Sequence, residues 1–233
     1  MSNTLLVDER IDKTERHTLE LNGYEVILCP INNNLYSAVS AHPDMSIHVV
    51  SEKIIVASKN IYPILSDKLI SMDYALHLCK NEPSLVYPNN IGLNAVSLKN
   101  YFIHNINHTD EILLEMIENK KIINIKQGYT KCSIAIVGDN SVITSDKGIE
   151  KALRKEGIDV LLLPGGDIEL PGLKYGFIGG ASGLIEKDIM AFYGDLNYYE
   201  YGYEVLEFLK KYKVKPLYLR KGRLYDRGSI IRL

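Results

Sequence analysis

The sequence predicts an α/β fold in which five similar units, each made of strand, turn, strand, helix and strand, close into a ring. One ten-residue segment matches another without a gap, 49–58 against 136–145. The same pattern recurs about every 40–50 residues, and one unit is divided between the two ends of the chain. Pairing of the last strand with the first would remove the exposed edges that an open array of strands presents.

The clearest unit lies between residues 131 and 163. Gly138-Asp139-Asn140 supplies a tight turn between two apolar segments, which predicts a hairpin. Asp146 can cap a following helix, and Gly157 can end it. The expected elements are strands 131–137 and 141–144, a helix 147–156 and a strand 158–163.

The other four units repeat this order of elements, so we expect a single domain over residues 1–233. The unit at the N-terminus lacks its first strand, which we place at the far end of the chain, 228–233. The alternative is a generic α/β domain without a true repeat. The expected elements are strand 4–7, helix 13–21 and strand 24–29; strands 45–50 and 54–56, helix 67–79 and strand 84–87; strands 91–98 and 101–103, helix 109–120 and strand 122–125; strands 175–178 and 189–192, helix 200–211 and strand 215–219.

Composition excludes several classes of protein. Hydrophobic residues make up 46% and charged residues 24%, which is typical of a globular chain. Lys and Arg total 27 against 29 for Asp and Glu, and the net charge of -2 gives no basic field for nucleic acid or an anionic membrane. Three cysteines without C-x-x-C spacing argue against a disulfide framework and a zinc finger. With no basic leader and no long apolar run, we expect a cytoplasmic protein.

Two local segments resemble a known superfamily. Residues 163–167 (LPGGD), with the strand-like 172–179 after them, resemble the Glu-Gly-Gly-Asp turn and strand of arginine deiminases. Residues 42–48 (HPDMSIH) resemble the start of an inner propeller strand. With the repeat, the resemblance to the penteins, the guanidino-group-modifying enzymes, covers nearly the whole chain. It is similar to what an uncharacterised bacterial branch of this superfamily would show. The resemblance implies a five-bladed pseudosymmetric ββαβ propeller around a narrow central channel, closed by pairing of the C-terminal and N-terminal strands.

The chain departs from the pentein hydrolases at their catalytic positions. The resemblance places a nucleophilic cysteine near the last inner strand, where this chain has Gly228-Ser229. Pro164 replaces the glutamate of the turn, and the family's His-x-Asp element finds only Tyr193-Gly194-Asp195. We therefore expect no standard deiminase or amidinohydrolase activity.

The candidate site residues lie in the loops that lead into the predicted inner strands, namely 42–48, 89–94, 127–132, 165–175 and 226–229. Cys132 could be a nucleophile whose thiolate is favoured by Lys131 and by a histidine across the channel, or a small buried residue at a strand start. Asn94 lies in another of these loops and is expected to contact the ligand.

His42 and His48 bracket Asp44, and on a strand Asp44 and His48 would share one face. They could form a base oriented by a carboxylate, or a turn residue and a half-buried strand histidine; a metal site would need a third ligand that the sequence does not locate. Asp167 could accept a cationic group or could close a Gly-Gly-Asp turn, and Asp195 is a further candidate carboxylate.

These residues favour a protein that binds a small ligand carrying an amine or a guanidine in the central channel. We expect no cofactor, no metal, and no nucleic acid or membrane partner, and the oligomeric state stays open. Two alternatives remain. One is a non-catalytic member of the same fold that binds macromolecules, and the other is a divergent hydrolase that depends on Cys132.

Overall fold

The protein is represented by a computed structural model, which describes residues 3–117 and 119–233. Its strands form five three-stranded sheets. In each sheet the middle strand pairs antiparallel with one neighbour and parallel with the other. The sheets, each with its middle strand second, are β15 (Ile231–Arg232), β1 (Thr4–Asp8) and β2 (Glu25–Cys29); β3 (Ile47–Ser51), β4 (Ile54–Ala57) and β5 (Ala75–Leu78); β6 (Val96–Ser97), β7 (Tyr101–His104) and β8 (Lys121–Asn124); β9 (Ile134–Gly138), β10 (Ser141–Thr144) and β11 (Asp159–Leu162); β12 (Ser182–Glu186), β13 (Ile189–Phe192) and β14 (Lys215–Tyr218).

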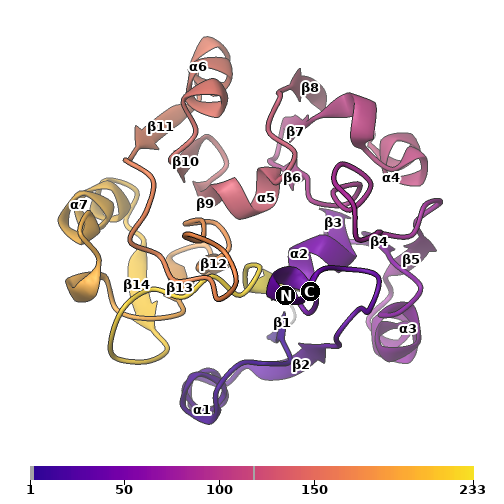
Figure 1. Cartoon of the computed structure of the whole chain (residues 1–233), viewed down its shortest axis with the longest axis horizontal. Coiled ribbons are helices and arrows are strands. Elements are labelled where there is room, and N and C mark those ends of the chain that lie inside the picture. The colour runs from indigo at the N-terminus through magenta and orange to yellow at the C-terminus, as the bar shows by residue number, and fades with distance from the viewer. Residues whose placement is uncertain (1–2, 118) are drawn as a thin grey trace.

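A helix connects the two parallel strands of every sheet, and Figure 1 shows these helices at the periphery with the sheets around a common centre. Asp12, Asp110 and Asp146 cap three of them through their side chains, which satisfies backbone N–H groups of the first turn. The five helices are α1 (Lys13–Leu21), α3 (Tyr62–Ser71), α4 (Glu111–Met116), α6 (Lys147–Lys155) and α7 (Gly202–Lys211).

Short helical turns occupy the connections. Two single-turn helices, α2 (Pro43–Ser46) and α5 (Thr130–Ser133), lead directly into β3 and β9. The 3-10 turns are η1 (Ser37–Val39), η2 (Ile106–His108) and η3 (Leu196–Tyr198). In the described part of the chain, no helix has the length and apolar character needed to cross a membrane.

The two ends of the chain meet in one sheet, as the sequence predicts. Leu5 pairs with Arg232 and Leu6 with Ile231 in antiparallel register. The Leu233 N–H then donates to the Thr4 carbonyl at 3.0 Å. Figure 1 shows the N and C labels side by side near the centre.

Buried side chains join each sheet to the next. Each sheet is named here by its middle strand. Clusters of apolar residues link the β1 sheet to the β4 sheet, β4 to β7, β7 to β10, β10 to β13, and β13 back to β1. Pairs that represent these five clusters are Leu6 with Ile47, Val56 with Phe102, Ile103 with Ile134, Ile143 with Phe192, and Ala191 with Leu5.

The element boundaries correct the sequence predictions in several places. The bounds expected for 13–21 and 141–144 are confirmed. The helix expected at 67–79 lies earlier, at Tyr62–Ser71 (α3), because Pro63 fits its first turn. The strand expected at 84–87 also lies earlier, at Ala75–Leu78 (β5). The helix expected at 109–120 ends at Met116, and Glu118 lies outside the described residues.

The largest error concerns the fourth unit. Its first strand is β12 at Ser182–Glu186, not 175–178. Residues 176–181 instead form an irregular segment that makes backbone hydrogen bonds with residues 132, 168, 227 and 229. The first halves of the strands expected at 45–50 and 131–137 are α2 and α5, and only Val96–Ser97 of 91–98 is a strand.

Candidate functional site

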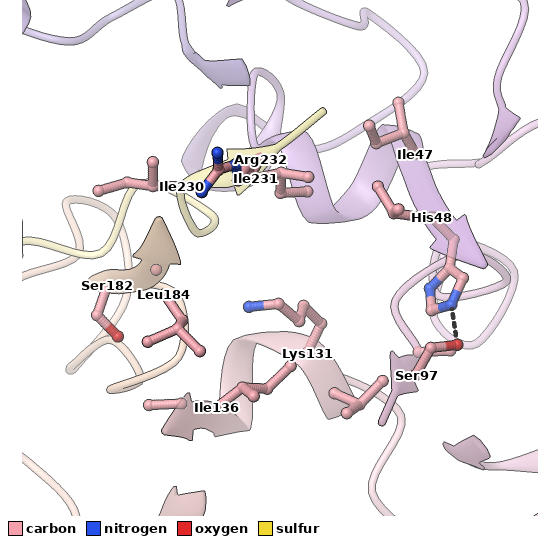
Figure 2. A pocket seen from close by; sticks show the side chains of 15 residues that line it. Ile47, His48, Ser97, Lys131, Ile136, Ser182, Leu184, Ile230, Ile231 and Arg232 are labelled. Atoms are coloured by element: carbon pink, nitrogen blue, oxygen red, sulfur yellow. Dashed lines mark hydrogen bonds between the residues drawn. The ribbon is translucent and has the colours of Figure 1, made fainter. Parts of the chain in front are cut away.

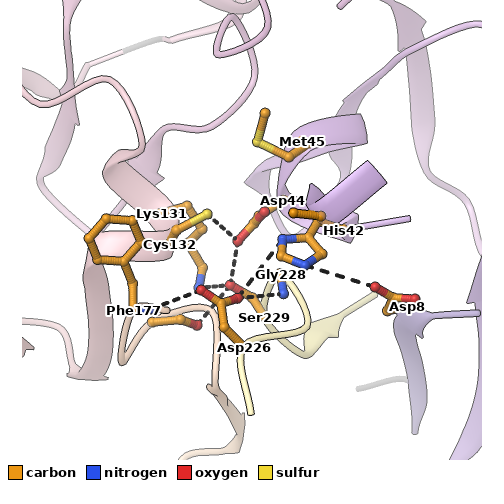
Figure 3. A network of polar contacts seen from close by, with 12 residues as sticks. Asp8, His42, Asp44, Met45, Lys131, Cys132, Phe177, Asp226, Gly228 and Ser229 are labelled. Atoms are coloured by element: carbon orange, nitrogen blue, oxygen red, sulfur yellow. Dashed lines mark hydrogen bonds and ion pairs between the residues drawn. The ribbon is translucent and has the colours of Figure 1, made fainter. Parts of the chain in front are cut away.

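Polar side chains from the segments that precede the inner strands meet at one place (Figure 3). We call this group the central cluster. His42 and Asp44 lie at the start of α2, Asn94 just before β6, Lys131 and Cys132 in α5, and Asp226 and Ser229 before β15. The segment before β12 adds the carbonyl of Gly179. The members of the central cluster are His42, Asp44, Asn94, Lys131, Cys132, Asp226 and Ser229.

Asp44 is the hub of the cluster. Its Oδ2 accepts a hydrogen bond from the Ser229 hydroxyl at 2.8 Å and lies 3.2 Å from the thiol sulfur of Cys132. The single Ser229 proton is shared between Asp44 Oδ2 and the Gly179 carbonyl, because both oxygens lie 2.8 Å from Oγ. The second Asp44 oxygen, Oδ1, has no partner within the described residues, although it is buried.

Lys131 and Asn94 hold the cluster together. The Lys131 ammonium donates to Ser229 Oγ at 2.9 Å. Burial lowers the pKa of Lys131, while Asp44 and Cys132 act in the opposite direction. The Asn94 amide donates to the Asp44 carbonyl at 3.1 Å, and its Oδ1 accepts the Lys131 N–H at 2.8 Å. Asn94 thereby ties α2 to α5 and acts as a positioning residue.

His42 is buried between two carboxylates. Only 1% of the residue is exposed, and neither ring nitrogen has a hydrogen-bond partner among the residues described. Nδ1 lies 3.9 Å from Asp226 Oδ1, and Nε2 lies 4.0 Å from Asp8 Oδ2. Gly228 makes room for the ring, since a Cβ there would lie 2.2 Å from the His42 Cβ, and its φ of +69° also favours glycine.

Asp226 is fixed by backbone groups. Its Oδ2 accepts the Phe177 N–H at 2.8 Å, and its Oδ1 accepts the Gly228 N–H at 3.0 Å. Burial raises the pKa of Asp226, whereas His42 and these backbone donors favour its charged form.

Cys132 is a buried thiol in this conformation. Burial raises its pKa well above the ordinary value, and the charges of Asp44 and Asp226 act in the same direction. Its exposed fraction is 3%. A cysteine nucleophile needs an accessible thiolate, and the surroundings of Cys132 supply neither access nor a stabilised anion.

A cavity of about 240 Å³ lies next to the cluster and is lined by residues of all five inner strands and by Lys131. We call it the inner-strand cavity. Figure 2 shows the Lys131 amine extending in among the side chains of Ile136, Leu184 and Ile231. Its polar lining includes Ser182 and Arg232, whose guanidinium pairs with Glu186.

His48 lines the inner-strand cavity and is separate from Asp44. Its Nε2 lies 2.9 Å from the hydroxyl of Ser97, and burial lowers its pKa to about 3. The expectation that Asp44 and His48 share one face of a strand is wrong, because Asp44 belongs to α2 and only His48 lies on β3.

Asp167 and Asp195 lie outside the cluster and outside the inner-strand cavity. Asp167 pairs with Arg223 and accepts the Glu200 N–H at 2.8 Å. Asp195 caps η3 by accepting the Asn197 N–H at 2.8 Å. The error follows from the misplaced fourth unit, since 177–181, and not 165–175, leads into its inner strand.

The cluster therefore unites His42, Asp44, Asn94, Lys131 and Cys132 of the expected residues. Sequence reasoning missed Ser229, Asp226 and Asp8 as neighbours of these groups. Two sequence signals pointed toward Ser229: the segment 226–229 leads into the predicted last inner strand, and the resemblance puts a cysteine at this position.

Known structures share this fold. An amidinotransferase of saxitoxin biosynthesis from Microseira wollei superposes with a TM-score of 0.56 at 10% identity, over 87% of this chain and 72% of that one. A dimethylarginine dimethylaminohydrolase from Pseudomonas aeruginosa, complexed with citrulline, superposes with a TM-score of 0.55 at 8% identity, over 94% of this chain and 92% of that one. The agmatine deiminase of C. jejuni superposes with a TM-score of 0.54 at 12% identity, over 93% of this chain and 86% of that one.

These neighbours are members of the pentein superfamily, and the chain shares their fold. No curated protein matches it in sequence. A family model described as "Family of unknown function (DUF6873)" matches residues 6–231, nearly the whole chain. The protein is therefore a member of this family, DUF6873.

Proposed function

We propose that this protein binds a small molecule in the inner-strand cavity and that Lys131 holds an anionic group of that ligand. The charge of the lining carries the proposal. Two cations, Lys131 and Arg232, are among the described residues that line the cavity, and no carboxylate is. A ligand carboxylate or phosphate would accept charge-assisted hydrogen bonds from the Lys131 ammonium.

The cavity would lie on the axis of a closed five-bladed propeller. This arrangement is supported by the pairing of β15 with β1 and by the buried clusters, whose succession leads from each sheet to the next and back to the first. Because the inner strands surround the cavity, its walls come from rigid elements, which favours a site formed before the ligand arrives.

The size and the walls of the cavity restrict the ligand further. At about 240 Å³ the cavity is just smaller than the roughly 300–1,000 Å³ of typical ligand pockets, so it suits a small ligand. Ile136, Leu184 and Ile231 offer aliphatic surface around the Lys131 amine. A short aliphatic chain that ends in one anionic group matches both features.

The positions of the carboxylates argue against the cationic ligand that the sequence suggested. Asp44 is enclosed in the central cluster, Asp167 pairs with Arg223, and Asp195 caps η3. A guanidinium in the inner-strand cavity would meet the Lys131 ammonium instead of a carboxylate, and like charges at short distance repel.

Standard guanidine chemistry is also disfavoured. Ser229 stands where the resemblance implies a cysteine, and its hydroxyl lies between Asp44 and Lys131 with no exposed surface. The Cys132 alternative would require the thiol to become accessible and ionised, against its burial and raised pKa.

The test is calorimetric titration with hexanoate, hexylamine and agmatine at equal concentrations. We expect hexanoate to bind, because it combines an aliphatic chain with one carboxylate. Lys131→Met keeps the length of the side chain and removes its charge, so hexanoate affinity should fall at least tenfold, the lower end of a charged hydrogen bond of about 1.5–3 kcal/mol. Lys126→Met removes a lysine that is exposed and does not line the cavity, so it should leave the hexanoate affinity unchanged.

A second pair of variants tests the place of binding. Leu184→Trp adds bulk to the cavity wall and should abolish hexanoate binding, whereas Leu173→Trp lies at an exposed residue and should not. Thermal melts verify that all variants fold. Binding of agmatine or hexylamine alone, or hexanoate binding that is unchanged in Lys131→Met and in Leu184→Trp, would refute the proposal.

A further inference from the structure

Three potential metal ligands of different chemistry meet in the central cluster. One ligand atom each of His42, Asp44 and Cys132 lies within 4.8 Å of the other two, and all three residues are buried. Figure 3 shows His42 and Asp44 at the start of α2 facing Cys132 from α5. Asp44 and Cys132 are 88 positions apart in the chain, so the fold creates the group.

The same group contains buried polar atoms without partners. Both ring nitrogens of His42 and the Oδ1 of Asp44 are enclosed and make no hydrogen bond to any described residue. His42 and Asp44 are each 1% exposed. Buried polar atoms are nearly always satisfied, so three unsatisfied atoms in one place indicate a missing partner that binds nitrogen and oxygen together.

We propose that His42, Asp44 and Cys132 bind a zinc ion. Imidazole, carboxylate and thiolate are the three side-chain ligands that zinc takes in proteins, whereas calcium and magnesium require oxygen ligands. Binding replaces the Cys132 thiol proton, which leaves to solvent, so that thiolate and carboxylate together balance the charge of Zn²⁺. The fourth position would be open to water or to a ligand.

The distances suit a tetrahedral ion after a small movement of one side chain. Bonds of about 2.0–2.3 Å place neighbouring zinc ligands roughly 3.5 Å apart. The Cys132 sulfur and Asp44 Oδ2 are already 3.2 Å apart. The His42 ring would move toward these two atoms, because no hydrogen bond restrains it.

The surroundings supply the outer partners that a zinc histidine requires. Asp226 faces Nδ1 of His42 at 3.9 Å, and Asp8 faces Nε2 at 4.0 Å. Whichever ring nitrogen binds the metal, the other can donate its proton to a carboxylate, which fixes the ring and raises its basicity. Ser229 holds Asp44 in the same way through its 2.8 Å hydrogen bond.

The experiment titrates the metal-free protein with Co²⁺ and then displaces it with Zn²⁺. We expect one equivalent of Co²⁺ per chain, a thiolate-to-cobalt charge-transfer band, and loss of that band when Zn²⁺ is added. Cys132→Ala should abolish the band, whereas Cys79→Ala, which changes a buried cysteine outside the cluster, should retain it. His42→Gln should weaken Zn²⁺ binding at least tenfold, and His77→Gln should have no effect.

Two further measurements keep the result unambiguous. Thermal melts show whether Cys132→Ala and His42→Gln fold, and Zn²⁺ should raise the melting temperature of the wild type but of neither variant. Leu184→Trp, which fills the inner-strand cavity and changes no member of the central cluster, should still bind one Zn²⁺, so the two proposals fail separately. Failure of the wild type to bind Co²⁺, or a charge-transfer band that persists in Cys132→Ala, would overturn the zinc site.

Discussion

Removal of residues 230–233 would delete β15 and the side chains that join the end of the chain to its beginning. Ile230 and Leu233 are each 3% exposed and pack into different clusters, Ile230 with Leu5 and Leu233 with Leu6. The deletion also removes the antiparallel partner of β1 and leaves backbone groups of that strand without hydrogen bonds.

The magnitude follows from these contacts. Loss of a buried Ile or Leu side chain costs about 2–5 kcal/mol, so two such losses cost about 4–10 kcal/mol before any backbone contribution. A domain has about 5–15 kcal/mol of stability in total, so the truncated chain should be largely unfolded or have a much lower urea midpoint. Urea unfolding followed by tyrosine fluorescence and circular dichroism measures it, since the chain has 16 Tyr and no Trp.

Two matched variants separate the causes. The double variant Ile230→Ala, Leu233→Ala keeps the β15 backbone. Its free energy of unfolding should fall only by the part that comes from the two side chains. Tyr203→Ala removes a large side chain that is 73% exposed and should stay within about 0.5 kcal/mol of the wild type. A truncated chain with the urea midpoint of the full chain would show that the terminal strands do not pair.

Three other outcomes follow from the structure. Burial lowers the pKa of His48 to about 3, below about 6.5 in the unfolded chain, so the folded state binds fewer protons and stability falls as pH drops below about 6.5. Between pH 6.5 and 5, urea unfolding should show a loss of stability that is about 1.6 kcal/mol smaller in His48→Gln than in the wild type and unchanged in the exposed His17→Gln; an equal loss in His48→Gln would contradict it. The native protein should label slowly with a thiol reagent and fully in urea, because its three cysteines are buried, and fast labelling of Cys132 would show an open site. Agmatine and methylated arginines should yield no citrulline-type product, and robust turnover lost in Cys132→Ala would establish the hydrolase alternative.

The repeat was predictable because each unit carries its own local signals. Two apolar segments separated by a tight turn, Asp146 as a helix cap and Gly157 as a helix stop define one unit without reference to the rest of the chain. The pairing of β15 with β1 followed from the unit that lacked a strand. The fourth unit failed because Tyr175 and Phe177 look like strand residues, while Asp226, 49 positions beyond Phe177, holds that segment through its backbone.

The central cluster was only partly predictable for the same reason. Cys132 and Asp44 are recognisable as chemically capable residues, but their 3.2 Å contact depends on two helical turns from different units. Nothing local marks Ser229 as the link between Asp44 and Lys131. Asp167 misled because a Gly-Gly-Asp turn has the same sequence whether it binds a ligand or pairs with Arg223.

A crystal structure of the protein with hexanoate would locate the ligand and its anionic group. We expect the carboxylate at about 2.7–2.9 Å from the Lys131 Nζ, the length of a charge-assisted hydrogen bond. The aliphatic chain should lie against Ile136, Leu184 and Ile231 inside the inner-strand cavity. Hexanoate bound elsewhere, or a cavity that takes up hexylamine and excludes hexanoate, would show that Lys131 is not an anion anchor.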